Sequence, residues 1–119
     1  MDDFAGRTVL VTGGATGLGF AAARLAGQRG AAVALLGHVA GEVEAAAEAL
    51  RGEDLSALAL VADIADPAAV EAAFAKLDAE APAPLYGLVC NAAIQPYGTV
   101  ETMPPHEWDA VLGVNLRGA

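Results

Sequence analysis

Three glycines stand close together near the start of the chain, at positions 13, 17 and 19. They belong to the run Thr-Gly-Gly-Ala-Thr-Gly-Leu-Gly over residues 12–19, which follows an apolar stretch and precedes a helical pattern. At such a turn the helix N-terminus offers unpaired N–H groups and the positive end of the helix dipole, and both suit a phosphate. We expect Gly13 to make the turn, while Gly17 and Gly19 allow a pyrophosphate and the helix to approach closely. A plain glycine-rich turn is the alternative interpretation.

Side chains for other kinds of catalysis are sparse in this sequence. The one serine, Ser56, lies outside any Gly-x-Ser-x-Gly turn, so a serine hydrolase is not indicated. No Gly-Lys-Ser/Thr loop for a nucleoside triphosphate is present. The one cysteine, Cys90, and the two histidines have no clustered spacing, so we expect no metal site. We expect Cys90 to be a small buried residue and not a nucleophile.

The charge balance narrows the range of partners. The formal net charge is −9, and six scattered basic residues cannot form the patch that nucleic acid requires. No apolar run approaches the roughly 20 residues that span a bilayer. The acidic start, Met1-Asp2-Asp3, differs from the basic start of a secretory signal. We therefore expect a cytoplasmic protein with neither nucleic acid nor a membrane as a partner.

Apolar runs and helical patterns alternate along the chain. Strands are predicted at residues 7–11, 31–36, 57–62 and 85–91, and helices at residues 17–29, 42–51, 66–79 and from 104 onward. Asp66 followed by Pro67 is typical of a helix start, with Asp66 as the N-cap. Apolar strands joined by helical crossovers form a parallel sheet that is covered on both faces. We therefore expect one α/β domain over residues 1–119, built on a doubly wound parallel sheet.

The last predicted helix and strand lack clear boundaries. Residues 115–119 carry no strong capping signal beyond Gly118, and the fourth strand leaves a sheet edge with no visible blunting device. We therefore expect a sheet truncated after about four strands. In the first helix we expect one shared face formed by Leu18, Ala22, Leu25 and Ala26. We expect Trp108, in the last helix, to lie in the core.

Several motifs, in chain order, resemble those of the short-chain dehydrogenase/reductase family. The spacing Thr12-Gly13-x-x-x-Gly17-x-Gly19 is similar to the family's glycine motif, and Asp63-Ile64 resembles its adenine-contacting pair. Cys90-Asn91-Ala92-Ala93 is similar to the family's Asn-Asn-Ala-Gly motif, with alanine in place of glycine. Trp108-Asp109 with Val114-Asn115-Leu116 resembles the helix that holds a catalytic asparagine. The resemblance covers the whole chain and implies a Rossmann-type fold and an NAD(P)-dependent oxidoreductase acting on a carbonyl compound or secondary alcohol.

The resemblance also implies a role for each matched position. The implied cofactor-binding residues are Thr12, Gly13, Thr16, Gly17, Leu18, Gly19, His38, Asp63, Ile64, Asn91, Ala92 and Ala93. Asp63 would accept a hydrogen bond from the adenine amino group, and the Ile64 N–H would donate one to the ring. Asp63 could instead cap a turn, but Asp66 already caps the next helix, so we expect Asp63 to be available to the cofactor. Asn115 takes the one catalytic position, where it helps hold a proton-relay water. A methyltransferase shares the glycine-rich turn but does not predict Asp63, Asn91 and Asn115 at these places.

The form of the cofactor is decided at the end of the second strand, where a carboxylate would bind the 2′-hydroxyl of NAD and repel a 2′-phosphate. The chain has Gly37-His38 there, so the acid that selects NAD is absent. His38 falls where relatives that prefer NADP often carry arginine, whereas Thr16 stands where such relatives often carry a basic residue. We favour NADP, and a solvent-exposed histidine without a role is the alternative.

The family's reaction also requires a serine and a Tyr-x-x-x-Lys pair, which this chain lacks. Tyr86 is followed four residues later by Cys90, and Tyr97 by Glu101. We therefore expect the 119-residue chain alone to be inactive on a small-molecule carbonyl or alcohol substrate. The alternative function is a non-catalytic dinucleotide-binding or partner-pairing module from a truncated gene, with the fourth strand as its pairing surface. The resemblance implies a homo-oligomer that uses the helix from Pro105 and the helix after it; residues 1–119 supply only part of that surface, so the oligomeric state is left open.

Overall fold

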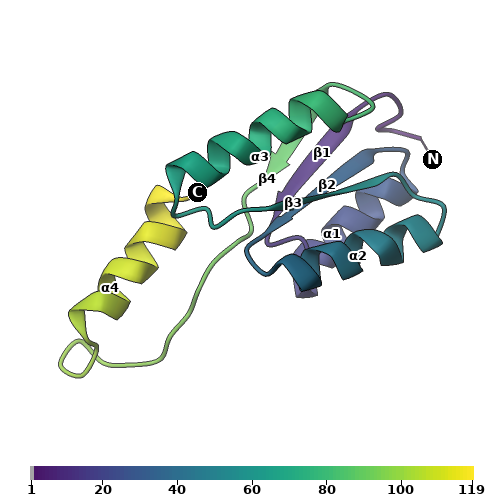
Figure 1. Ribbon diagram of the computed structural model, residues 1–119. Helices are drawn as coiled ribbons and strands as arrows, with labels where there is room; N and C mark the ends of the chain where they lie inside the picture. The colour runs from purple at the N-terminus through teal and green to yellow at the C-terminus, as the bar shows by residue number, and fades with distance from the viewer. Residues whose placement is uncertain (1) are drawn as a thin grey trace.

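A four-stranded parallel sheet lies at the centre of the computed structural model, which describes residues 2–119 (Figure 1). The strands are β1 (Thr8–Thr12), β2 (Ala32–Gly37), β3 (Ala57–Val61) and β4 (Leu85–Val89), in the order β3-β2-β1-β4. In the central pairs Val9 lies opposite Val33 on β2 and Gly87 on β4. The predicted strands agree with these bounds to within two residues at either end, and the predicted parallel sheet is confirmed.

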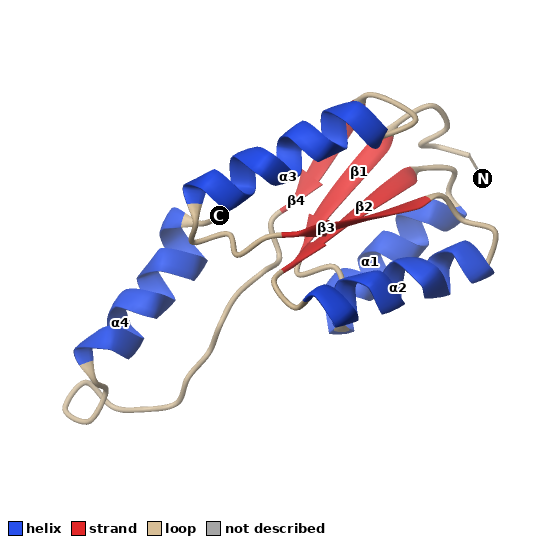
Figure 2. Ribbon diagram, in the orientation of Figure 1, coloured by secondary structure: helices blue, strands red, loops and turns tan. Residues whose placement is uncertain are grey.

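Helices cover both faces of the sheet, as predicted for a doubly wound fold. Figure 2 shows α1 (Gly17–Gln28) and α2 (Ala40–Gly52) on one face and α3 (Pro67–Glu80) on the other. A long loop then leads to α4 (Pro105–Leu112), which points away from the sheet and continues into a π-helical turn, η1 (Gly113–Arg117). Within residues 2–119 no helix has both the length and the apolar character needed to cross a membrane.

The core is divided between the two faces because successive strand residues point to opposite sides. Val11 and Leu35 pack with the buried residues of α1 and α2, whereas Leu10, Leu36 and Leu60 pack with those of α3. All five side chains are almost fully buried. This two-sided burial explains why β1 and β2 have apolar residues without alternation in the sequence.

The face of α1 that packs on the sheet is not the one formed by Leu18, Ala22, Leu25 and Ala26. Leu18 is 79% exposed, and the buried residues of α1 are Gly19, Ala23 and Gly27, whose small size lets the helix lie close to the sheet. Two expectations about burial were wrong. Trp108 is 54% exposed because α4 does not pack on the sheet. Cys90 is also exposed, since it follows an edge strand instead of a central one.

The two edges of the sheet differ in their protection. At β3, the Arg51 Nε donates to the Ala57 carbonyl at 3.0 Å, and the Lys76 Nζ donates to the Ala59 carbonyl at 3.2 Å. These two cations, from the helices on either face, cover backbone groups that another strand would otherwise pair with. At β4 the large apolar side chains are exposed instead: Leu85, Tyr86, Leu88 and Val89. The predicted lack of a blunting device at the fourth strand agrees with this structure.

Candidate functional site

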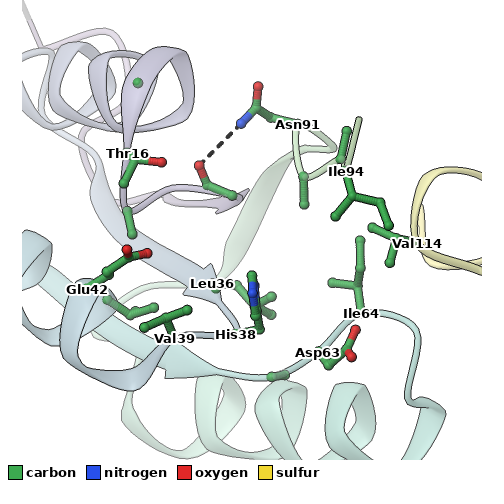
Figure 3. Close-up of a pocket in the computed structure, with 18 of the residues that line it drawn as sticks. Thr16, Leu36, His38, Val39, Glu42, Asp63, Ile64, Asn91, Ile94 and Val114 are labelled. Carbon is green, nitrogen blue, oxygen red and sulfur yellow. Dashed lines mark hydrogen bonds between the residues drawn. The ribbon is translucent and has the colours of Figure 1, made fainter. Parts of the chain in front are cut away.

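A cavity of about 560 Å³ opens at the carboxyl ends of the strands (Figure 3). This is the edge of a parallel sheet at which doubly wound folds bind their ligands, and the volume suits a small-molecule ligand. The predicted site residues that line it are Gly13, Thr16, Gly17, Leu18, His38, Asp63, Ile64, Asn91, Ala92 and Ala93. Residues from four separate segments therefore come together here, whereas Thr12, Gly19 and Asn115 lie outside the lining.

The glycine turn has the backbone that the spacing predicted. Gly13 and Gly17 have φ angles of +63° and +54°, which side chains on an L-residue disfavour. Thr16 is the N-cap of α1, yet its side chain caps no backbone N–H. The first bond of the helix runs from the Phe20 N–H to the Thr16 carbonyl, so the N–H groups at positions 17–19 precede the helical ladder. The turn therefore brings free donors and a helix dipole to the cavity.

Gly19 has a packing role behind the cavity wall. A Cβ on this residue would overlap the Gly13 carbonyl oxygen and would lie 2.5 Å from the Asn91 Nδ2. The Gly19 position is buried, unlike that of Gly17, where an added Cβ would meet nothing within 4 Å. Gly19 therefore permits the close contact of α1 with the turn, and Gly17 keeps the rim of the cavity open.

Thr12 joins the glycine turn to the end of β4. Its Oγ1 accepts hydrogen bonds from the backbone N–H groups of Asn91 at 3.0 Å and Ala92 at 3.1 Å, and it donates to the Val89 carbonyl at 3.4 Å. The Asn91 Nδ2 donates to the Gly13 carbonyl at 3.2 Å (Figure 3). Thr12 thus acts on the site by positioning the residues that line it.

Asp63 was expected to have no structural bond of its own, and the structure corrects this. Its Oδ1 accepts the Ala65 N–H at 2.9 Å and so closes a turn before α3. Asp66 caps α3 as predicted, its carboxylate accepting the Ala68 N–H at 3.1 Å. Asp63 therefore has a structural bond on one carboxylate oxygen while it also lines the cavity beside Ile64 (Figure 3).

Asn115 lies in η1 and binds the backbone of a neighbouring loop. Its Oδ1 accepts the Ile94 N–H and its Nδ2 donates to the Ile94 carbonyl, both at 2.9 Å. Both polar ends of the side chain are therefore used on one residue. Ile94 lines the cavity, and so does Val114, the residue before Asn115. In this structure the asparagine side chain is a positioning group.

Some lining residues were missed by the sequence analysis. Val39 and Glu42 reach the cavity from the start of α2, and Ala110 and Val114 reach it from α4 and η1. The sequence analysis placed Glu42 at the start of a predicted helix, and no motif distinguished it. Among residues 2–119 no group of three or more His, Cys, Asp and Glu side chains is arranged to hold a metal ion.

Comparisons with known proteins agree on one family. The family model described as short chain dehydrogenase matches residues 7–119. A C alpha-dehydrogenase from Sphingobium sp. is 34% identical, over 99% of this chain and 39% of the relative. A gluconate 5-dehydrogenase from Burkholderia cenocepacia, solved in complex with NADP and tartrate, is 33% identical with a TM-score of 0.88, over 98% of this chain and 46% of that one. A 3-oxoacyl-(acyl-carrier protein) reductase from Brucella melitensis with bound NAD is 32% identical with a TM-score of 0.87, over 96% and 44%. The chain spans less than half the length of these relatives.

The Thr12 hydroxyl can be tested by removing it. We expect Thr12→Val to lower the free energy of unfolding by about 1 kcal/mol, because two partly buried N–H groups would lose their acceptor. Thr12→Ser keeps the hydroxyl, and its free energy of unfolding should fall clearly less than that of Thr12→Val. Urea denaturation of the two variants measures the difference, and equal losses would contradict the role assigned to the hydroxyl.

Proposed function

The chain belongs to the short-chain dehydrogenase/reductase family, and from this we propose that its cavity binds a nicotinamide dinucleotide. The observation that supports this most directly is where the glycine turn lies. It joins β1 to α1 at the carboxyl end of β1, where the strand order reverses, with β2 on one side of β1 and β4 on the other. Doubly wound folds bind dinucleotides at this switch point.

The residues present fit such a ligand. A Cβ at Gly13 would meet the Ala92 Cα at 3.0 Å, so glycine lets the turn pack against the segment after β4. The space at Gly17 is open, which leaves room for a pyrophosphate at the N-terminus of α1. In our proposal Asp63 and Ile64 contact the adenine, and the Asn91 segment borders the nicotinamide half. The bound group would supply a hydride acceptor or donor.

We propose that this chain binds the cofactor without turnover. Proton exchange with a carbonyl or alcohol needs the serine and the Tyr-x-x-x-Lys pair, and residues 1–119 contain neither. Among the catalytic positions of the family only Asn115 is present, and its side chain holds the Ile94 backbone. In a longer protein of this family the same half would orient the cofactor toward a small carbonyl or alcohol substrate.

We also propose NADP as the preferred form of the cofactor. Gly37 offers no carboxylate to the 2′ position, and His38 is an imidazole that lines the cavity next to it. An imidazole can donate a hydrogen bond to a phosphate, and it does so more strongly when protonated. Related proteins have been solved with NADP and with NAD, so the family accommodates both.

A second candidate function is pairing with another chain through β4. Four large apolar side chains on this edge are exposed, and no lysine or arginine of residues 2–119 donates a hydrogen bond to its backbone, in contrast to β3. An exposed apolar edge strand favours addition of another strand. This function would not require turnover and is compatible with a bound dinucleotide.

The dinucleotide proposal is tested by titrating the 119-residue chain with NADP⁺ in a calorimeter. We expect binding by the unaltered chain and a loss of affinity of at least about tenfold in Gly19→Ala, because overpacking moves α1 away from the turn. Gly41→Ala is the matched control, since an added Cβ there meets nothing within 4 Å. No binding by the unaltered chain, or reduction of a ketone by it, would contradict the proposal.

The preference for NADP is tested by the ratio of the two dissociation constants at pH 7. We expect NADP⁺ to bind at least about threefold more tightly than NAD⁺, with the ratio falling in His38→Ala and rising in His38→Arg. His106→Ala, in the first turn of α4 and outside the cavity lining, should leave the ratio unchanged. A ratio below about threefold in the unaltered chain argues against the NADP preference.

Pairing through β4 is tested by light scattering over a range of concentrations. We expect a mass above that of the monomer, reduced in Leu88→Lys because a charge on the edge opposes strand addition. Val100→Lys replaces another exposed apolar residue, in the loop before α4, and should have no effect. A concentration-independent monomer mass would exclude this function.

A further inference from the structure

The end of β2 has no room for the carboxylate that selects NAD elsewhere in such folds. A Cβ at Gly37 would lie 2.8 Å from the Val43 Cγ2, and Val43 is almost fully buried in α2. A side chain at position 37 would therefore force the buried Val43 side chain at the start of α2 to shift. Glycine at this position lets the start of α2 lie directly against the end of β2.

This close approach brings a different carboxylate to the cavity. Glu42 precedes Val43, lies in the first turn of α2 and lines the cavity together with Thr16 and His38. Figure 3 shows its carboxylate on the side of the cavity that faces the Thr16 turn, with His38 on the neighbouring strand end. Among residues 2–119 the carboxylate of Glu42 has no hydrogen-bond or ion-pair partner, and it is therefore available to a ligand.

We propose that Glu42 is a specificity-determining residue that opposes a 2′-phosphate and keeps the preference for NADP small. This inference rests on the dinucleotide site proposed above. A 2′-phosphate would bring negative charge to the rim of the cavity that Glu42, Thr16 and His38 share. Its charge and that of the Glu42 carboxylate repel each other, and water and salt weaken this repulsion. The 2′-hydroxyl of NAD carries no charge, and a carboxylate is a good acceptor for it.

The charges around the cavity strengthen this argument. Its lining contains two carboxylates, those of Glu42 and Asp63, and no lysine or arginine from residues 2–119. The imidazole of His38 is the one basic side chain that residues 2–119 contribute to this lining. Opposed action of His38 and Glu42 therefore predicts a site that accepts both forms of the cofactor, with the balance set by these two side chains.

An ordinary structural role for Glu42 makes a different prediction. An acidic side chain in the first turn of a helix stabilises the helix through its dipole by about 0.3–1 kcal/mol. If this were its whole contribution, neutralising Glu42 would lower the melting temperature slightly and leave cofactor selectivity unchanged. Selectivity is therefore the measurement that separates the two roles.

The experiment compares dissociation constants for NADP⁺ and NAD⁺ in the 119-residue chain, in Glu42→Gln and in Glu44→Gln, by calorimetry at low salt. Glu44→Gln removes the same charge from the same helix, but Glu44 does not line the cavity. We expect Glu42→Gln to raise the NADP⁺-to-NAD⁺ affinity ratio about fivefold or more, and Glu44→Gln to change it less than about twofold. The effect of Glu42→Gln should shrink at high salt.

Three results would overturn the inference. An unchanged ratio in Glu42→Gln means that the carboxylate does not meet the 2′ position. Equal increases in Glu42→Gln and Glu44→Gln mean that only the net charge of the helix matters. Both of these leave the proposed cofactor site intact, whereas failure of the unaltered chain to bind either dinucleotide overturns that site and this inference together.

Discussion

The close contact between α1 and the turn before it is the constraint on which the site depends. The Gly13 carbonyl and the Asn91 amide occupy the space where a side chain at Gly19 would lie. The Thr12 hydroxyl holds the other side of the same turn by accepting two N–H groups from the segment after β4. The end of β1 therefore positions both the helix N-terminus and the Asn91 segment, and a change at this one strand end would move both walls of the cavity.

The sheet and many of the residues that line the cavity were predictable from the sequence, for a physical reason. Parallel strands buried on both faces are continuous apolar runs, so β1 and β2 stand out even without alternation. Their carboxyl ends meet at one edge, so polar residues that follow different strands come together without any knowledge of side-chain packing. The family resemblance singled out His38, Asp63 and Asn91, each of which follows a different strand, and all three line the cavity.

What the sequence did not predict are side-chain contacts, because the spacing of apolar residues does not show how closely two elements pack. In α1 the large residue Leu18 was expected on the same face as Ala22 and Ala26, but the helix lies so close to the sheet that only glycine and alanine fit beneath it. Asp63 was assigned to the adenine and Asn115 to a proton-relay water; these roles stay predictions, and the structure adds that each side chain also bonds backbone. Short polar side chains at element ends often do both, and only coordinates reveal the partner.

Two glycines, Gly19 and Gly37, have the same effect on packing, since each lets a helix approach a strand closely. Gly19 lets α1 approach β1, and Gly37 lets α2 approach β2. The first approach presents N–H groups, which attract phosphate, whereas the second presents the Glu42 carboxylate, which repels it. A dinucleotide would therefore gain affinity at its pyrophosphate, which both cofactor forms share, and would be discriminated at the 2′ position, where they differ. In our proposal the strength of cofactor binding and its selectivity are thus set by different helices, and each can change without the other.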